Sequence, residues 1–396
     1  MSEWQTFCLK DLGKIVGGAT PPTNNPKNYG NKIAWITPKD LSTLQGRYIK
    51  KGSRSISRLG FKSCSCVLLP KHAILFSSRA PIGYVAIAEK RLCTNQGFKS
   101  IIPNKKIYFE FLYYLLKYHK DNISNIGGGT TFKEVSGATL GLFKVKIPPT
   151  YYEQQKIART LSILDQKIEN NHKINELLHK ILELLYEQYF VRFDFLDENN
   201  KPYQTSGGKM KFSKELNRLI PSGWSVRFLN HKIVSTYQPK TISKTLLNDS
   251  YSYSVYGGGG IIGRFTEYNH EQSEFIISCR GQCGISYLTL PKSWITGNAM
   301  VIRPTKSYTS KTYLYHTIKK YKLTNYITGS VQPQITQQNL STMPILIPKR
   351  KTLNKWNNIS SLLWNLIHNN MQATQTLTAL RDFLLPLLLT QQVKPK

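Results

Sequence analysis

Acidic residues are scarce in this chain of 396 residues. It contains 22 Asp and Glu against 54 Lys and Arg, which leaves a formal net charge of +32. So few carboxylates offer little material for a nuclease site, and none cluster beside a Lys with nuclease spacing. The excess of positive charge predicts a polyanionic partner, with nucleic acid as the first candidate. If all proteins of the source organism were basic, this chain would carry excess positive charge for that reason, so charge alone does not identify the partner.

Long apolar runs are also missing. No stretch of 18 or more apolar residues occurs, and the segment 383–389 is short and contains Pro386. Residues 1–6 have neither the basic nor the apolar region of a signal peptide. We therefore expect a soluble, cytoplasmic protein.

Cysteine is sparse, and we expect the six cysteines to be reduced thiols. The spacings Cys64-x-Cys66 and Cys279-x-x-x-Cys283 could each supply half of a zinc site. Both differ from the common zinc motifs, and no His lies close to them in the sequence. The eight His are scattered singly, so we expect no metal site.

Catalytic motifs are absent as well. The four glycines 257–260 invite comparison with a phosphate-binding loop, but residues 263–265 read Gly-Arg-Phe instead of Gly-Lys-Ser/Thr. We interpret the glycines as a tight turn whose backbone approaches another surface, either a DNA groove or the protein's own core. Residues 147–150 read Ile-Pro-Pro-Thr and do not match the Asn-Pro-Pro-Tyr motif of amino-methyltransferases. The sequence thus favours a non-catalytic binding protein.

The most regular pattern that is present lies between about residues 153 and 190, where apolar residues recur at steps of three and four without Pro or Gly. This spacing predicts one helix of roughly 57 Å, at 1.5 Å per residue. A second stripe of this kind runs from about 353 to 385, with Asn370 as a polar residue at a seam position. Neither helix can bury its stripe on one small domain, so we predict an antiparallel coiled coil. The residues predicted to pack between the helices are Ile157, Leu161, Leu164, Ile168, Leu178, Ile181, Leu185, Leu363, Leu366, Leu377, Leu380 and Leu384.

An internal duplication organises the chain. The segment 129–148 matches 329–348 at an offset of 200 residues, and the pattern of Trp4–Leu9 restarts at Trp224–Leu229. A period this long indicates two globular modules rather than a solenoid. We predict an α+β protein with two mixed α/β modules, each followed by a long helix, related by a pseudo-two-fold repeat. The predicted parts are module one (1–150), helix one (151–192), a linker (193–223), module two (224–348) and helix two (349–390).

Several short motifs, taken in order, resemble the specificity subunits of Type I restriction–modification systems. They are Pro148-Pro149 with Glu153-Gln154, the helix end 185–191 with Phe193-Asp-Phe195, the linker motifs 198–203, 206–210 and 220–224, and the helix end 380–386. The resemblance covers nearly the whole chain. It departs from the family pattern at 349–354, where Lys-Arg-Lys-Thr-Leu-Asn replaces a Glu-Gln start.

The resemblance implies a division of labour. Each module would be a target-recognition domain that reads one half of a bipartite site in double-stranded DNA, and the helices would set the spacer between the half-sites. Two methyltransferase subunits, which carry S-adenosylmethionine, and two motor-nuclease subunits would assemble on this chain, which would hold no cofactor itself. The alternatives are a recognition subunit of a related system that cuts on both sides of its site, and a basic RNA-binding scaffold.

Arg79 and Arg280 occupy equivalent places in the two modules, each before a turn that ends in Gly. Two modules that read different half-sites would share phosphate-anchoring residues but not base-reading ones. We therefore predict that both arginines contact phosphate or brace the loop. Hydrogen bonds from Arg to carbonyl groups of the turn are an equally good interpretation.

Base-reading residues are expected where the modules differ. Gln332 and Gln334 stand opposite Phe132 and Glu134, and Gln can pair with adenine through two hydrogen bonds. Both could instead cap the strand that follows. The candidates in the corresponding loop of module one are Thr130, Thr131 and Lys133.

A basic insertion without a match in module two runs from Arg47 to Arg58. Its arginines Arg54 and Arg58 are further candidates for DNA contact. A solvated charged loop is the commoner outcome for such a segment.

Overall fold

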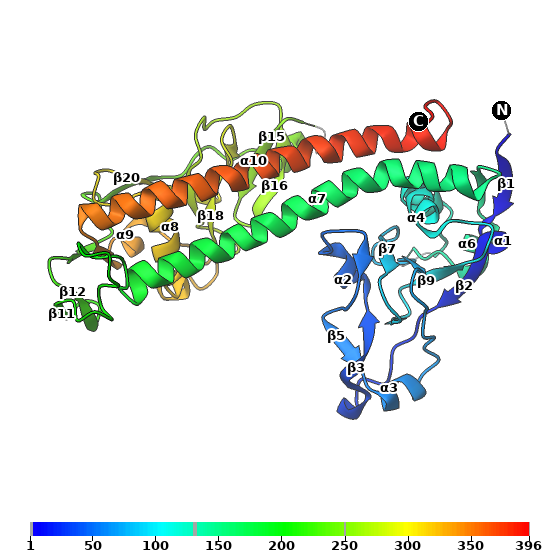
Figure 1. Cartoon of the computed structure of the whole chain (residues 1–396), viewed down its shortest axis with the longest axis horizontal. Helices are drawn as coiled ribbons and strands as arrows, with labels where there is room; N and C mark the ends of the chain where they lie inside the picture. Colours follow the sequence, from blue (N-terminus) through cyan, green and yellow to red (C-terminus); the bar gives the residue numbers. More distant parts are fainter. Residues whose placement is uncertain (1–2, 130–132, 249–250, 396) are drawn as a thin grey trace. The chain divides into compact units, whose positions relative to one another are not determined.

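The computed structural model describes residues 3–129, 133–248 and 251–395, and the chain forms two compact units. The first unit comprises Met1–Lys173 and Asn370–Lys396, and the second comprises Ile174–Asn369. Each unit contains one module together with a part of both long helices, α7 (Tyr151–Tyr186) and α10 (Arg350–Leu389), shown in Figure 1. The domain bounds drawn from the sequence stay a prediction, because the compact units divide the two helices instead of separating them from the modules.

Module one is built on a five-stranded sheet with the order β2-β9-β6-β7-β4. Its strands are β2 (Gly13–Gly17), β9 (Lys99–Pro103), β6 (Ile74–Phe76), β7 (Val85–Ala88) and β4 (Tyr48–Ile49). A smaller sheet contains β5 (Arg54–Ile56), β3 (Tyr29–Ile36) and β8 (Cys93–Thr94), and β1 (Gln5–Cys8) pairs with β10 (Lys144–Ile147). The helices are α1 (Leu9–Leu12), α2 (Pro38–Ser42), α3 (Arg58–Lys62), α4 (Phe109–Tyr118), α5 (Lys120–Asn125) and α6 (Gly137–Leu142).

Module two is built on a four-stranded sheet with the order β14-β20-β17-β18. Its strands are β14 (Val234–Tyr237), β20 (Ala299–Pro304), β17 (Phe275–Ser278) and β18 (Ser286–Leu288). A smaller sheet contains β16 (Gly260–Phe265), β15 (Tyr253–Gly257) and β19 (Trp294–Ile295), and β13 (Ser225–Phe228) pairs with β21 (Pro344–Ile347). Its α-helices are α8 (Lys311–Lys319) and α9 (Gln337–Leu340), and the linker before the module forms the hairpin of β11 (Met210–Ser213) and β12 (Arg218–Pro221).

The two modules repeat one plan, which confirms the internal duplication. The ladder β1–β10 pairs Gln5 with Ile147, and the ladder β13–β21 pairs Ser225 with Ile347. The strand order β2-β9-β6-β7 recurs as β14-β20-β17-β18, and one amphipathic helix, α4 or α8, packs on each sheet. The expected α+β class is therefore confirmed, with one difference: β4 extends the sheet of module one at an edge where the sheet of module two ends with β18.

The long helix α7 begins at a side-chain cap that gives the Glu153-Gln154 motif its role. The backbone N–H of Glu153 donates to Thr150 Oγ1 (3.2 Å), and Thr150 Oγ1 donates back to Glu153 Oε2 (3.0 Å). The amide of Gln154, which is 1% exposed, accepts from the backbone N–H of Tyr108 and donates to the carbonyl of Lys106. The motif thus joins the start of α7 to the loop before α4.

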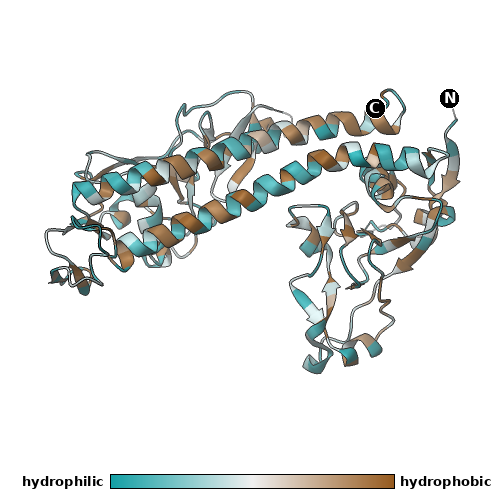
Figure 2. Cartoon of the chain, in the orientation of Figure 1, coloured by the Kyte–Doolittle hydropathy of each residue, from teal (hydrophilic) through white to brown (hydrophobic). Residues whose placement is uncertain are grey.

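The core of the first unit contains side chains from the module and from both long helices. Leu112 and Leu116 of α4 are buried together with Leu161 of α7 and with Leu385 and Leu388 of α10. Burying one such side chain contributes about 1.5–3 kcal/mol. Figure 2 shows apolar and polar residues alternating along both long helices, as the sequence periodicity predicts. Within the described residues, no helix has the length and apolar content to span a bilayer.

Candidate nucleic-acid interface

The loops that carry Arg79 and Arg280 are built in the same way. The N–H of Val135 donates to the carbonyl of Ser78, and the N–H of Ile335 donates to the carbonyl of Cys279, each at 3.0 Å. A bridge between Gly128 and Glu134 closes a loop in module one, and a bridge between Thr328 and Gln334 closes the equivalent loop in module two. Glu134 and Gln334 therefore lie in the same place, each beside the arginine of its module.

A carboxylate partly neutralises the arginine of module one. Arg79 Nη1 lies 3.5 Å from Glu134 Oε2, and Lys99 Nζ lies 3.2 Å from Glu134 Oε1. The side chains of Arg79 and Glu134 are 37% and 35% exposed, so water screens the pair and its contribution to stability is small. The pair nevertheless holds the guanidinium toward the loop.

Module two replaces both partners of this arrangement. Gln334 stands in place of Glu134. The buried Met300 stands in place of Lys99, because the N–H of Ser78 donates to the carbonyl of Gly97 and the N–H of Cys279 donates to the carbonyl of Asn298, two residues before each. Within the described part of the chain, Arg280 forms no ion pair. The two arginines are equivalent in the sequence but differ in their charge environment.

The glycines 257–260 form the turn of the hairpin β15–β16, in which Gly257 pairs with Gly260. Gly260 has φ +95°, a backbone conformation that favours glycine. A Cβ on Gly258 would lie 2.8 Å from the carbonyl oxygen of Arg280. Gly258 thus approaches the loop of Arg280 in the same module, whereas Gly259 faces open space, and approach of this turn to a DNA groove stays a prediction.

The predicted base-reading side chains of module two lie on the surface. Gln332 and Gln334 are exposed, and in module one Lys133 is exposed as well. Gly329 has φ +91°, and a Cβ there would lie 2.6 Å from the carbonyl of Gln332, so the loop requires glycine at this point. Thr130 and Thr131 lie outside the described residues. Contact of these residues with bases stays a prediction.

The basic insertion of module one is an ordered part of the fold. It forms β4, β5 and the start of α3, which corrects the interpretation as a solvated loop. Arg54 lies over the ring of Tyr29 at 4.1 Å from its centroid, and Arg58 is exposed at the first position of α3. Arg47 is 3% exposed, so it is not a surface residue.

The long helices run antiparallel within each unit. In the first unit Asp165 meets Arg381 (2.8 Å) and Asn171 Nδ2 donates to Thr374 Oγ1 (3.2 Å). In the second unit Asn175 Nδ2 donates to the carbonyl of Ile367 (3.3 Å). Polar residues thus join the two helices in both units.

The predicted packing stripe agrees with the structure in part. Ile157, Leu161 and Ile168 are buried. The partly buried members are Leu164, Leu178, Leu185, Leu363, Leu377 and Leu384.

Ile181, Leu366 and Leu380 depart from the prediction, because each is more than 40% exposed. For Ile181 and Leu366, which lie in the second unit, module two explains the difference, since α8 competes for the helix faces there; Leu380 lies in the first unit. Trp356 contacts His316 of α8 and Trp364 contacts Tyr315, so the buried face of α10 turns toward the module.

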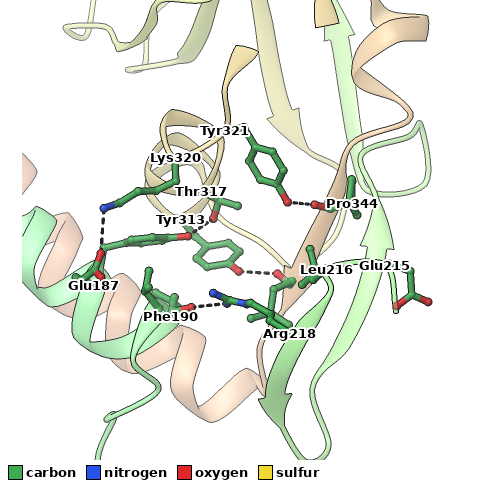
Figure 3. A pocket seen from close by; sticks show the side chains of 13 residues that line it. Glu187, Phe190, Glu215, Leu216, Arg218, Tyr313, Thr317, Lys320, Tyr321 and Pro344 are labelled. Carbon is green, nitrogen blue, oxygen red and sulfur yellow. Dashed lines mark hydrogen bonds and ion pairs between the residues drawn. The ribbon is translucent and has the colours of Figure 1, made fainter. Parts of the chain in front are cut away.

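A pocket of about 500 Å³ in the second unit lies where the end of α7 meets the linker hairpin, α8 and β21 (Figure 3). Its polar side chains bond to one another or to the backbone. Glu187 pairs with Lys320 (3.0 Å), and Arg218 Nη2 donates to the carbonyl of Phe190 (3.0 Å). Tyr186 donates to Thr317 Oγ1 (3.0 Å). Arg218 thus attaches the linker hairpin to the end of α7, a role that no sequence motif indicated, and the other two contacts attach the end of α7 to module two.

A duplicated module with exposed Arg, Lys and Gln side chains on equivalent loops has the organisation of a bivalent binding protein. The family described as Type I restriction modification DNA specificity domain matches residues 1–180 and 221–377. The chain therefore belongs to this family, and it is a specificity subunit, a component for DNA recognition rather than catalysis. The family resemblance inferred from the sequence motifs is confirmed.

Individual relatives agree with this placement. The chain is 32% identical over 429 residues to the Type I restriction enzyme MjaIX specificity subunit of Methanocaldococcus jannaschii, covering 99% of this chain and 94% of that protein. It is 30% identical over 191 residues to the HindI specificity subunit of Haemophilus influenzae, covering 46% of this chain and 40% of that protein. Its fold is similar to the crystal structure of a Type I restriction–modification S subunit from M. genitalium, with a TM-score of 0.60, 18% identity and coverage of 97% and 96%.

Proposed function

We propose that each module reads one half of a bipartite site in double-stranded DNA, and that the paired helices set the spacer between the half-sites. The observation that supports this proposal most directly is that the loops beside Arg79 and Arg280 have the same backbone hydrogen bonds but carry different side chains. Glu134 beside Arg79 is replaced by Gln334 beside Arg280 on equivalent loops. Glu accepts from cytosine and Gln pairs with adenine, so the same framework can present two specificities.

The base-reading role of module two is tested by the double variant Gln332→Ala, Gln334→Ala in a complex with the methyltransferase subunit. We expect the methylated half-site of module two to lose discrimination at one or two base pairs, each worth about 1–3 kcal/mol, while the other half-site stays the same. The matched control is Gln337→Ala, which alters an amide of the same type in α9. A recognition sequence unchanged in the double variant would refute the role of these two residues.

The proposed assembly contains two methyltransferase subunits and two motor-nuclease subunits, and it acts on DNA in the cytoplasm. S-adenosylmethionine is assigned to the methyltransferase subunits. The isolated chain is expected to show no binding of S-adenosylmethionine by calorimetry, whereas the complex with methyltransferase binds it. Binding by the isolated chain would contradict the proposed division of labour.

A further inference from the structure

The edge strand β4 distinguishes module one from module two. It pairs in parallel with β7, as Tyr48 with Ile87 and Ile49 with Ala88. The N–H of Ile87 also donates to the carbonyl of Arg47 at 2.8 Å, which fixes the backbone of this residue on the sheet. In module two the corresponding sheet ends at β18 within the described residues. The strand therefore brings to module one a residue that has no counterpart in the described part of module two.

Arg47 joins the body of module one to helix α7. Its Nε lies 3.1 Å from Glu169 Oε1, and its backbone N–H donates to the same oxygen at 3.0 Å. Its Nη1 lies 3.2 Å from Glu110 Oε1 on α4, and that carboxylate also accepts from the hydroxyl of Tyr48. One buried guanidinium thus binds a module helix and a long helix at once.

The same network reaches the second long helix. Asp165 of α7 forms an ion pair with Arg381 of α10, with Oδ1 2.8 Å from Nη1. Its Oδ2 accepts a hydrogen bond from the hydroxyl of Tyr114 of α4 at 2.6 Å. Arg47 Nε lies 4.0 Å from the same carboxylate. Burial, reinforced by Asp165, raises the pKa of Tyr114, so its hydroxyl keeps the proton that it donates. Strand β4, helix α4 and both long helices therefore meet at one buried polar cluster.

Such a cluster determines geometry more than stability. Buried ion pairs recover little beyond their desolvation cost, and apolar residues often replace them without loss of stability. The planar guanidinium donates to carboxylates in only a few orientations, whereas apolar contacts tolerate small rotations. The three carboxylates and two guanidiniums of this cluster thus restrict how module one can turn on the helices.

Module two meets the helices through different chemistry. His316 of α8 stacks on Tyr186 of α7 at 5.5 Å between ring centroids and contacts Trp356 of α10 at 5.3 Å. The two ion pairs nearby, Lys319 with Glu183 (48% and 49% exposed) and Lys320 with Glu187 (53% and 30% exposed), are screened by water and give weak orientation. Module two is therefore attached mainly by aromatic packing.

We propose that Arg47 is a positioning residue that fixes the angle of module one on the two long helices and thereby the spacer length that the assembled enzyme accepts. This inference rests on the proposed function, in which the spacing between half-sites is read by the helices. The residue contacts neither DNA nor a partner in this account. Its effect passes through Glu110, Asp165 and Glu169.

The test uses the full chain with Arg47→Met in its methyltransferase complex. Its substrates are duplexes that keep both half-sites and vary the spacer by one or two base pairs. Small misplacements of reacting groups are worth up to ~100-fold in rate, so we expect methylation at the wrong spacers, relative to the correct one, to rise about tenfold. The half-site sequences stay unchanged. The variant Arg47→Lys keeps the positive charge but loses the planar set of N–H donors. Its methylation at wrong spacers is expected to lie between that of the wild type and that of Arg47→Met.

The matched control is Lys319→Met, which removes the cation of the exposed pair in module two and is expected to leave the spacer profile unchanged. An Arg47→Met complex that assembles and keeps the wild-type profile would overturn the inference. If that variant fails to assemble, Glu169→Gln and Tyr114→Phe decide in the same way. Both preserve size; the first removes the negative charge that faces Arg47, and the second removes the hydrogen bond to Asp165. If the complex with the wild-type chain methylated sites of every spacer length equally, the proposed function itself would be refuted.

Discussion

Two arginines that the duplication makes equivalent have different neighbours. Arg79 shares Glu134 with Lys99, whereas Arg280 has a neutral Gln334 beside it. A phosphate must compete with the carboxylate for Arg79 but meets no such competitor at Arg280. The phosphate-anchoring role predicted for both is therefore expected to be stronger in module two.

Salt dependence of DNA binding tests this difference. Arg280→Ala is expected to lower the slope of log K against log salt by about 0.9, the value for one lost phosphate contact. Arg79→Ala is expected to change the slope less, because Glu134 already neutralises part of its charge. Filter binding or fluorescence anisotropy between 50 and 200 mM salt, roughly the range over which such slopes are resolved, gives the measurement. Equal slopes for the two variants would contradict the assignment.

His316 makes the second unit sensitive to acid. Burial lowers its pKa to about 3, and burial lowers that of His368 to about 4. An unfolded His titrates near 6.5, so below that pH the unfolded state binds protons that the folded state does not. The stability from each neutral His is complete above about pH 6.5 and falls by about 1.4 kcal/mol per pH unit below it, until the folded pKa is reached.

The variant His316→Phe keeps the aromatic packing and removes one of these groups. We expect its free energy of unfolding to fall less than that of the wild type between pH 6.5 and pH 5, by about 2 kcal/mol over this interval. Urea titrations at the two pH values provide the comparison. An identical pH dependence in variant and wild type would show that His316 is not held neutral by burial.

At the scale of elements, the sequence indicated what periodicity and repetition encode. The two long helices follow from apolar spacing, and the duplication of the module follows from the offset of 200 residues. Strand β4 could not be foreseen, because two residues carry no pattern and their pairing with β7 is non-local. The burial of Arg47 was hidden for the same reason, since its carboxylate partners lie 63 and 122 residues away.

The buried face of a long helix is likewise decided by what packs on it. Apolar spacing of three and four residues identifies a helix but does not determine which of two neighbouring faces is buried. In the second unit, aromatic residues of α8 pack on one of these faces. This explains why Leu366 is 44% exposed while Trp364 and Ile367 are buried.

Helix α10 offers a matched pair of substitutions to test this packing. Trp356 is 1% exposed and contacts Phe190 and His316, whereas Leu362 on the same helix is 62% exposed. We expect Trp356→Ala to cost about 3–5 kcal/mol of stability and Leu362→Ala to change it by less than about 0.5 kcal/mol. Urea denaturation measures both. Similar losses in the two variants would mean that the helix presents another face to the module.

At the scale of the whole molecule, the duplication and the net charge of +32 contribute to DNA recognition in different ways. A basic surface supplies affinity for the DNA backbone independently of sequence. Two copies of one module then supply two readings, because each can vary its loop residues while it keeps its sheet. The two long helices, which contribute to both units, connect the two modules within one chain.

The central claim is that two modules read two half-sites at one spacing, and a genome-wide map of adenine methylation tests it most directly. The map is made in cells that express the methyltransferase subunit, with and without this chain. We predict one asymmetric motif that depends on the chain, with two short half-sites and a constant number of unspecified base pairs between them. Methylated sites that share one contiguous motif, or half-sites separated by variable spacers, would contradict the account.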